Sequence, residues 1–316
     1  MAGTTLTTLT QDYSDTRKYP ATLALVAGIA AVILWSSVPV ANKVALSYMD
    51  ALSAALLRGM MAGLFGLLIA IIARLPLPAA LPQWRLLLLS SVTSFIVWPL
   101  LLSLGLTHTS VSHTALIAAL LPVFTVLLGA LVEKRILKKG WWLGAGLALA
   151  ATFILVSTQH TASSSHEGAS LTGDLIVLAG VLSCATGYVS GGRLSSSIGP
   201  VSATFWGLAV SLVIILPAFA MLSLTTDWSA IAPAGWYAIG WMALLASTTG
   251  YLLWYFAIGF GNTSRIGSLL FAMPVIALIM AAFILEESIT LKMIVVCFCI
   301  IAGAFIAQKH TKSESI

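Results

Sequence analysis

Charged residues are scarce in this sequence, and their scarcity excludes a soluble fold. Only 8% of the 316 residues are charged, whereas 59% are hydrophobic. Soluble globular domains carry roughly 25% charged residues, so this chain has too few of them to cover a water-facing surface. The stretches between its apolar runs are too short for a separate soluble domain.

Cysteine and the common catalytic motifs are also sparse. The three cysteines, Cys184, Cys297 and Cys299, fall within apolar runs, where thiols behave as small hydrophobes. We therefore expect neither a disulfide framework nor a metal site. No G-x-x-x-x-G-K-[ST], H-E-x-x-H or G-x-S-x-G motif is present. This argues against a nucleotide-driven pump and a membrane-embedded enzyme, and no loop or tail is large enough for a receptor. We predict a protein that is not an enzyme and needs no cofactor.

Long apolar runs dominate the chain instead. A transmembrane helix needs roughly 20 apolar residues. The first 20 residues are polar, and no small-residue cleavage site follows the first run, so we interpret that run as a retained helix. The pattern predicts an all-α integral membrane protein with ten transmembrane helices, at residues 22–44, 51–73, 85–106, 112–132, 141–158, 174–195, 200–222, 235–258, 265–285 and 290–308.

Lysine and arginine are unevenly distributed between the two sides that ten spans define. Lys43 and Lys292 fall on one side and Arg58 within a span, while the other side receives the remaining twelve of the fifteen. Cytoplasmic loops carry such an excess, so we predict a multi-pass protein of the inner (plasma) membrane with both termini in the cytoplasm. The net charge of +5 reflects this bias, and we expect no nucleic-acid partner. The twelve are Arg17, Lys18, Arg74, Arg85, Lys134, Arg135, Lys138, Lys139, Arg193, Arg265, Lys309 and Lys312.

The second half of the chain echoes the first. Pro122 and Pro274, like Gly28 and Gly180, occupy similar positions at a constant offset in the two halves. Each half holds five spans, and because five is odd, the second half enters the membrane from the opposite side. Inverted repeats allow alternating access to a site at their interface. We therefore predict two inverted five-helix repeats around a central cavity: a cytoplasmic tail at 1–21, a first repeat at 22–158, an extracytoplasmic linker at 159–173, a second repeat at 174–308 and a cytoplasmic tail at 309–316.

Three stretches resemble one transporter family. They are "LWSSVPVANKVAL" at 34–46, "LGLTHTSVSHTALIAALLPVFTVLLGALVEKRIL" at 104–137 and "YLLWYFAIGFGNTSRIGSLLFAMPVIALIMAAFILEESIT" at 251–290. They are similar to EamA-type transporters of the drug/metabolite transporter superfamily. The resemblance implies ten helices in two EamA repeats and the export or exchange of small metabolites. The Gly-Glu that follows the fourth helix in this family is replaced by "EKR" here, with Glu133 two places early, whereas Glu287 stands at the expected place.

The first span carries a polar face. Trp35, Pro39 and Asn42 share it at helical spacing, Lys43 lies beside them, and Ser36 falls near the bilayer midplane. One interpretation is that this face lines the substrate pathway and that Lys43 guards its outer mouth. The alternative is that Ser36 bonds to backbone carbonyls while Lys43 reaches the outer headgroups.

Among the residues inside spans, Arg58 gives the strongest indication of a functional site. It lies eight residues inside the second span, and a central arginine costs roughly 2.5 to 3.5 kcal/mol on insertion scales. Such residues face a cavity or a partner, so Arg58 either attracts a substrate carboxylate or clamps carbonyls at a helix end.

Aromatic and hydroxyl side chains recur at similar depth in three further spans. Such stripes serve either helix packing or a ligand cavity, because tyrosine and tryptophan tips need hydrogen-bond partners away from the membrane interfaces. We assign to the pathway Phe95, Trp98, Tyr188, Thr248, Tyr251, Trp254 and Tyr255. By contrast, we interpret as interfacial anchors the tryptophans at span ends: Trp84, Trp141, Trp142, Trp228 and Trp236.

Three prolines lie inside spans, and a proline interrupts the helical hydrogen bonding. We predict hinges at Pro39, Pro122 and Pro274. His113 falls near the loop after the third span, and we interpret it as a solvated loop residue rather than a group that titrates at the outer mouth.

The absence of an aspartate or glutamate from the middle of any span bears on the substrate. A central cavity that contains aromatic rings, hydroxyls and one arginine, but no carboxylate, disfavours a bare organic cation and suits a neutral, anionic or zwitterionic solute. We therefore expect a secondary transporter for a small metabolite such as an amino acid, with proton or counter-solute coupling possible. A multidrug exporter of the same superfamily is the alternative. The expected partners are the small-molecule substrate and the lipid bilayer.

Overall fold

The fold is helical throughout the part of the chain that the computed structural model describes, residues 21–157, 170–260 and 263–311. Ten helices are long and apolar enough to cross a membrane, and each coincides with one of the ten predicted runs. They are Ala21–Leu46, Ala51–Ile72, Leu81–Leu106, Val111–Glu133, Lys139–Ser157, Leu171–Ile198, Pro200–Ser223, Pro233–Ile258, Ile266–Ile284 and Leu291–Lys309. Most of the predicted linker and most of each predicted tail lie outside the described residues.

Five spans are continuous helices, and five are divided. The continuous ones are α4 (Ala51–Ile72), α9 (Lys139–Ser157), α10 (Leu171–Ile198), α11 (Pro200–Ser223) and α16 (Leu291–Thr311). The divided ones, in chain order, are α2 (Ala21–Ser36) with α3 (Val38–Leu46); α5 (Leu81–Ser90), η2 (Ser91–Val97) and α6 (Trp98–Leu106); α7 (Val111–Ala118) with α8 (Leu121–Glu133); α12 (Pro233–Gly240), η5 (Trp241–Thr249) and α13 (Gly250–Phe260); and α14 (Thr263–Ser268), η6 (Leu269–Ala272) and α15 (Met273–Ile284).

The divisions have identifiable causes. Pro39, Pro122 and Pro274 each stand in the first turn of a new segment, α3, α8 and α15, where the missing N–H costs no helical hydrogen bond. The third span of each half contains a π-helical stretch, η2 in the first half and η5 in the second. Stretches of this kind release backbone carbonyls and are frequent at functional sites.

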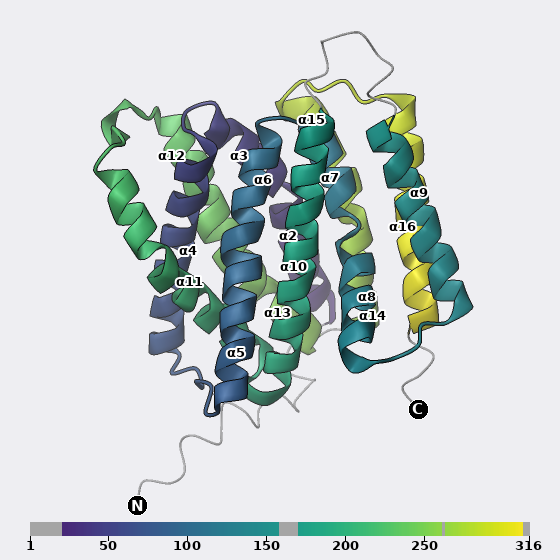
Figure 1. Cartoon of the computed structure of the whole chain (residues 1–316), viewed down its shortest axis with the longest axis horizontal. Helices are drawn as coiled ribbons and strands as arrows, with labels where there is room; N and C mark the ends of the chain where they lie inside the picture. Colours follow the sequence, from purple (N-terminus) through teal and green to yellow (C-terminus); the bar gives the residue numbers. More distant parts are fainter. Residues whose placement is uncertain (1–20, 158–169, 261–262, 312–316) are drawn as a thin grey trace, which may run out of the picture.

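Helices of the first half pack on helices of the second half. In the bundle α2 packs against α13, α6 against α10, α4 along α11, α7 against α15 and α9 along α16. Figure 1 shows the last pair side by side at one edge of the bundle. Span one pairs with span eight, the third span of the second half, and span three of the first half pairs with span six, the first span of the second half. This reciprocal pairing is the two-fold pattern expected of a duplicated chain.

Glycines allow the paired helices to approach closely. A Cβ added at Gly63 of α4 would lie 2.6 Å from the Cβ of Leu212 in α11, and one at Gly144 of α9 would lie 2.5 Å from the carbonyl oxygen of Gly303 in α16. Small residues at such crossings let helices pack tightly in membranes, where the hydrophobic effect between helices is absent. The contacts between the halves are therefore close at the level of the backbone.

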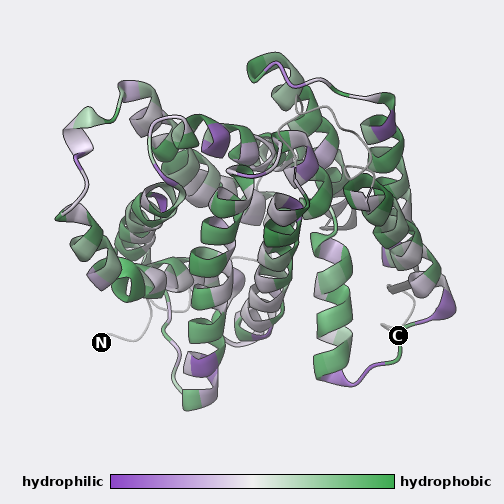
Figure 2. Ribbon diagram, turned by 45° about the horizontal axis from the view of Figure 1, so that its top comes forward, coloured by the Kyte–Doolittle hydropathy of each residue, from purple (hydrophilic) through white to green (hydrophobic). Residues whose placement is uncertain are grey.

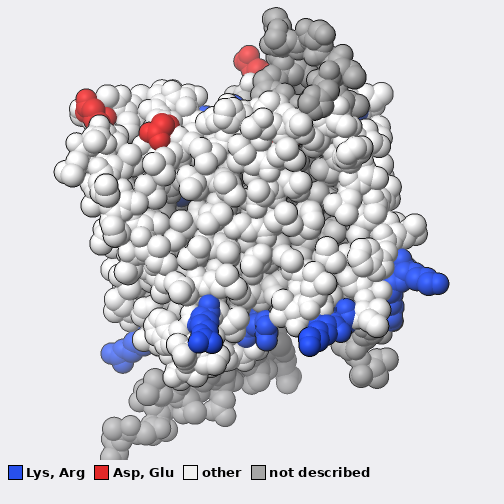
Figure 3. Space-filling model, in the orientation of Figure 1, with Lys and Arg blue, Asp and Glu red and all other residues white. Residues whose placement is uncertain are grey.

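The outer surface of the bundle is apolar. Large side chains are widely exposed on it, among them Ile72 at 79% and Phe283 at 83%, and hydrophobic residues cover most of the ribbon in Figure 2. Charged side chains gather at the two ends instead: lysine and arginine at the lower edge of Figure 3, and aspartate and glutamate at its upper edge. This is the surface of a protein that spans a bilayer.

Candidate functional site

Aromatic side chains from α2 and α13 meet inside the bundle. The ring centroid of Trp35 lies 5.3 Å from that of Tyr251 and 5.3 Å from that of Trp254. Tyr251 stacks on Tyr255 at 6.3 Å and meets the edge of Phe95 at 6.4 Å. These distances fall in the range of favourable aromatic pairs. Five of the predicted pathway residues, drawn from both halves, therefore form one group, which we call the aromatic cluster.

The π-helical stretch η5 holds this cluster in place. The indole N–H of Trp35 donates to the carbonyl oxygen of Ala246 at 3.0 Å, a group that lies inside η5. The hydroxyl of Thr248 donates to the carbonyl of Ala243, five residues earlier, at 3.0 Å. Thr248 is thus buried and bonded to its own helix. The altered hydrogen bonding of η5 supplies the acceptor that fixes the indole of Trp35.

Arg58 of α4 reaches the same region with weak partners. Its Nη2 lies 3.4 Å from the hydroxyl of Ser247, and its Nη1 lies 4.0 Å from the sulfur of Met242. Tyr251 and Cys184 are among its neighbours. A guanidinium has five N–H donors, and among the described residues no carboxylate lies within 4.0 Å of it. The positive charge of Arg58 therefore borders the aromatic cluster without a close anionic partner.

Tyr188 of α10 extends this region. Its hydroxyl is in hydrogen-bonding contact with that of Tyr251, yet 43% of the surface of Tyr188 is exposed. Tyr255 in turn shares a short hydrogen bond with Thr204 of α11. Tyrosine hydroxyls of α10 and α13 thus lie close together in this region.

The polar residues of the first span lie at separate places. The hydroxyl of Ser36 donates to the backbone carbonyl of Val32 at 2.7 Å. Asn42 is 1% exposed and exchanges hydrogen bonds with Ser103 of α6 at 3.0 and 3.1 Å. These contacts bind α3 to α6, and among the predicted residues of this span only Trp35 joins the aromatic cluster.

Lys43 and Trp98 also lie against neighbouring helices. The ammonium group of Lys43 donates to the carbonyl of Leu106 at 2.7 Å and lies 3.4 Å from that of Thr109, at the end of α6. The ring of Trp98 faces α10, where it would meet a Cβ on Gly180 at 2.9 Å. Both residues pack at helix contacts and not within the aromatic cluster.

Two expectations from the sequence are wrong. His113 is not solvated: it is 4% exposed, and its Nδ1 lies 3.0 Å from Oδ2 of Asp174, which is 1% exposed. Trp141 is not an interfacial anchor, because it is 1% exposed in the core between α8, α9 and α16. In both cases helices of the other half cover a side chain that sequence position alone assigns to the surface.

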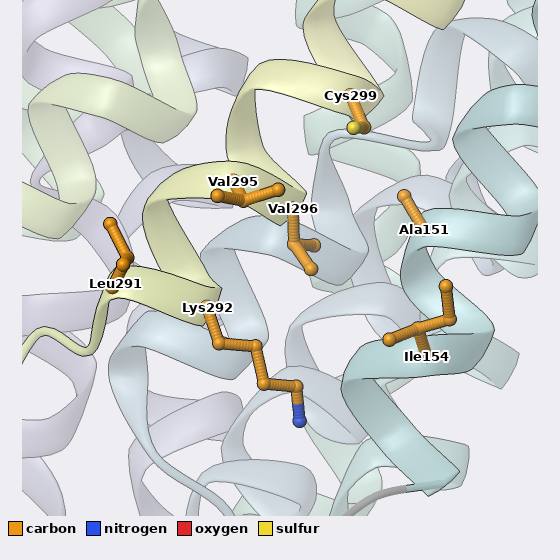
Figure 4. Close-up of a pocket in the computed structure, with 7 residues that line it drawn as sticks. All are labelled: Ala151, Ile154, Leu291, Lys292, Val295, Val296 and Cys299. Carbon is orange, nitrogen blue, oxygen red and sulfur yellow. The ribbon is translucent and has the colours of Figure 1, made fainter.

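A cleft of about 390 Å³ opens between α9 and α16. Apolar side chains line it together with Lys292, as Figure 4 shows. It contains none of the predicted pathway residues and lies at the edge of the bundle, so the central cavity stays a prediction.

Several residues of the central region escape the sequence analysis. Met242 and Ser247, which contact Arg58, and Thr204, which bonds to Tyr255, sit among many similar residues of apolar spans. Cys184 is buried, as expected of a small hydrophobe in a span, and it is also a neighbour of Arg58. No local pattern distinguishes these residues, because their role depends on which helices become neighbours.

The fold and the central region define a multi-pass helical membrane protein of duplicated architecture. The model of the EamA-like transporter family matches residues 22–157 and 171–308. The chain therefore belongs to the EamA-like transporter family, with two EamA domains. It is a membrane transporter and not an enzyme.

Individual relatives agree with this assignment. The chain is 27% identical over 287 residues to the uncharacterized transporter YdeK of Bacillus subtilis strain 168, covering 90% of this chain and 96% of the relative. It is 29% identical over 195 residues to a probable amino-acid metabolite efflux pump of Escherichia coli K12, covering 58% of this chain and 62% of the relative. A crystal structure that is 18% identical aligns with a TM-score of 0.61 over 94% of this chain and 100% of its own, which shows the shared fold.

Proposed function

We propose that this protein is a secondary transporter that exports or exchanges a small zwitterionic or neutral metabolite, foremost an amino acid, by alternating access between its two halves. The observation that carries the proposal is Arg58, a cation inside the bundle that borders the aromatic cluster and has only weak partners.

The contacts of Arg58 leave room for a stronger one. Ordinary N–H···O hydrogen bonds span roughly 2.7 to 3.2 Å, whereas the hydroxyl of Ser247 lies at 3.4 Å. A carboxylate binds a guanidinium through two parallel charge-assisted hydrogen bonds. A substrate carboxylate would therefore complete the coordination of Arg58, and the rings of Trp35 and Tyr251 would face the rest of the solute.

The relatives point the same way. Two of them, from Escherichia coli K12 and Salmonella typhimurium, are probable amino-acid metabolite efflux pumps. Both match only part of this chain, so the support they give concerns the solute class and not the individual solute.

A lipophilic organic cation fits the region less well. Aromatic faces attract cations, which is the one feature that favours such a substrate here. The guanidinium of Arg58 is a neighbour of Tyr251 in the aromatic cluster. Its positive charge would therefore repel a cation bound against that ring. We infer that a solute with a carboxylate binds more tightly than a bare cation.

The charge distribution supports a plasma-membrane protein with both termini in the cytoplasm. Arg74, Arg85 and Arg193 lie at or near span ends on the side that carries the basic excess, and basic side chains gather at one edge of the bundle in Figure 3. Cytoplasmic loops carry this excess in membrane proteins. A proton or a counter-solute would supply the driving force for export.

Counterflow in proteoliposomes tests the proposal. Vesicles loaded with an unlabelled amino acid should accumulate the labelled one transiently without nucleotide, and a panel of amino acids and a lipophilic cation would be compared. Arg58→Gln should lower kcat/KM for the transported amino acid roughly 10- to 150-fold, because a hydrogen bond to a charged group contributes about 1.5 to 3 kcal/mol.

The matched control is Arg193→Gln, since Arg193 is exposed near the end of α10 and should transport at the wild-type rate. Counterflow of the cation but of no amino acid by the wild-type protein would overturn the proposed solute class. Wild-type amino-acid transport by Arg58→Gln would remove Arg58 from substrate binding.

A further inference from the structure

A carboxylate of the second half holds the start of a helix of the first half. Glu287, which follows α15, accepts hydrogen bonds from the backbone N–H groups of Val111 and Ser112 at 2.7 and 2.9 Å, and from the hydroxyl of Ser112 at 2.6 Å. These groups form the first turn of α7. The contact joins residues that are 175 and 176 positions apart in the chain.

The geometry makes this a strong contact. The first N–H groups of a helix have no partner within the helix, and its dipole favours a negative charge there. A carboxylate with three donors satisfies both conditions at once, and charge-assisted hydrogen bonds are roughly twice as strong as neutral ones. Because α7 ends at Ala118 before the break that precedes α8, Glu287 anchors a short segment that is separate from the rest of its span.

A second carboxylate joins the halves beside the first. Asp174 in the first turn of α10 lies 3.0 Å from Nδ1 of His113 and accepts a hydrogen bond from the hydroxyl of Thr109 at 2.5 Å. The N–H and the hydroxyl of Ser170 both donate to the carbonyl of His108, at 2.9 and 2.7 Å. The loop between α6 and α7 is therefore bonded to the second half from two directions.

Lys43 completes the charge distribution at this end. Its ammonium group binds the last carbonyls of α6 and is attracted by Glu287. Positive and negative groups thus alternate across the junction of α3, α6, α7 and the chain after α15. We call Glu287, Asp174, His113 and Lys43 the outer network.

The first repeat has no acid at the position equivalent to Glu287. The offset that relates Pro122 to Pro274 relates Arg135 to Glu287. An arginine is unable to accept hydrogen bonds from helix amides. Glu133 instead pairs with Arg135 at 3.4 Å, with 56% of the Glu133 side chain exposed. In an inverted pair these positions lie at the cytoplasmic end, so within the part of the chain that the structure describes the carboxylate anchor is found at one end.

We infer that Glu287 is a positioning residue of the transport cycle: it closes the outer end by holding α7 against the second half, and the outside opens when α7 leaves this carboxylate. The inference rests on the alternating access of the proposed function. Glu287 thereby sets the balance between inward-open and outward-open states, and this role is separate from substrate binding at Arg58.

Cys184 offers a native reporter for this balance. It is 2% exposed, its carbonyl accepts from Ser94 of η2, and it is a neighbour of Arg58. In a Cys297→Ser, Cys299→Ser background it is the only thiol of the chain. A membrane-impermeant methanethiosulfonate added from outside will reach it only while the outer end is open.

Glu287→Gln keeps the shape of the side chain and removes its charge. We expect the labelling rate of Cys184 from outside to rise about tenfold, the factor that corresponds to losing roughly 1.4 kcal/mol of differential stabilisation, and labelling from the cytoplasmic side to fall. Glu286→Gln, a change at the exposed neighbouring glutamate, should label as the parent does. Ser112→Ala, which removes only the hydroxyl contact, should shift labelling in the same direction by a smaller factor.

The outcomes separate this inference from the proposed function. A folded Glu287→Gln protein that labels from outside at the parental rate would overturn the role of Glu287, even if amino acids are transported. If Glu287→Gln fails to fold, an unchanged rate in Ser112→Ala would overturn it equally. A shift in labelling without amino-acid transport would uphold the outer closure and refute the proposed substrate.

Discussion

The packing of α9 on α16 gives a sharp test of the interlocked halves. Gly144 and Gly146 lie two residues apart on α9. A Cβ at Gly144 would lie 2.5 Å from the carbonyl oxygen of Gly303 and 2.5 Å from the amide nitrogen of Ala307, whereas a Cβ at Gly146 would meet no atom within 4 Å. The same substitution at the two positions therefore has opposite consequences.

Gly144→Ala should destabilise the protein. Both close atoms belong to the backbone, so the two helices must move apart by roughly 1 Å, and overpacking of this kind costs about 1 to 3 kcal/mol. Gly146→Ala gains helix propensity, which amounts to as much as about 1 kcal/mol in a helix interior. For a chain of this length we expect Tm to fall by roughly 2 to 6 °C for Gly144→Ala, and to stay equal or rise slightly for Gly146→Ala.

The ten tryptophans of the chain allow thermal unfolding of the detergent-purified protein to be followed by intrinsic fluorescence. Size-exclusion chromatography before and after heating would check that loss of signal reports unfolding. Equal Tm values for the two variants would refute the close contact between α9 and α16, and with it the pairing of the last span of each half.

Two further predictions concern local contacts. Asp50 caps α4 by accepting from the N–H groups of Leu52 and Ser53 at 2.9 Å, so Asp50→Ala should cost about 0.5 to 2 kcal/mol at pH 7 in urea-dependent unfolding. Burial opposes ionisation of this carboxyl, but the hydrogen bonds from Ser53 and Leu52 outweigh it and lower the pKa of Asp50. Its stabilising effect should therefore be present above about pH 4 and be lost as pH falls further; an equal cost at pH 3 would contradict this assignment. Trp35→Phe keeps an aromatic ring, although a smaller one, and removes the donor to Ala246, so we expect a loss of about 1 to 3 kcal/mol in the same assay; stability equal to wild type would show that the bond contributes nothing.

The sequence predicts the fold closely because the bilayer imposes length and polarity on every span. Apolar runs of transmembrane length mark all ten helices within a few residues. The prolines also predict where α3, α8 and α15 begin, since proline removes a backbone donor wherever it stands. The π-helical stretches η2 and η5 cannot be predicted in this way, because a π-helical turn requires no particular residue type.

The candidate site is predicted only in part. Thr248, Tyr251 and Tyr255 recur at helical spacing in one span, and Trp35 shares a face with Pro39 and Asn42 in another. The sequence therefore identifies these rings before their neighbours are known. The buried pair of His113 and Asp174 is missed, because each residue stands near a span end and only the packing of α7 on α10 removes both from water. Residues whose environment is made by another segment of the chain carry no local signal.

Recognition of a carboxylate by Arg58 is the central claim, and competitive binding tests it most directly. A radiolabelled amino acid that the purified protein transports would be competed with the amine that lacks its carboxylate and with the acid that lacks its amino group. We predict that the amine competes at least tenfold more weakly than the amino acid, and that Arg58→Gln abolishes this difference. An amine that competes as well as the amino acid on the wild-type protein would contradict it.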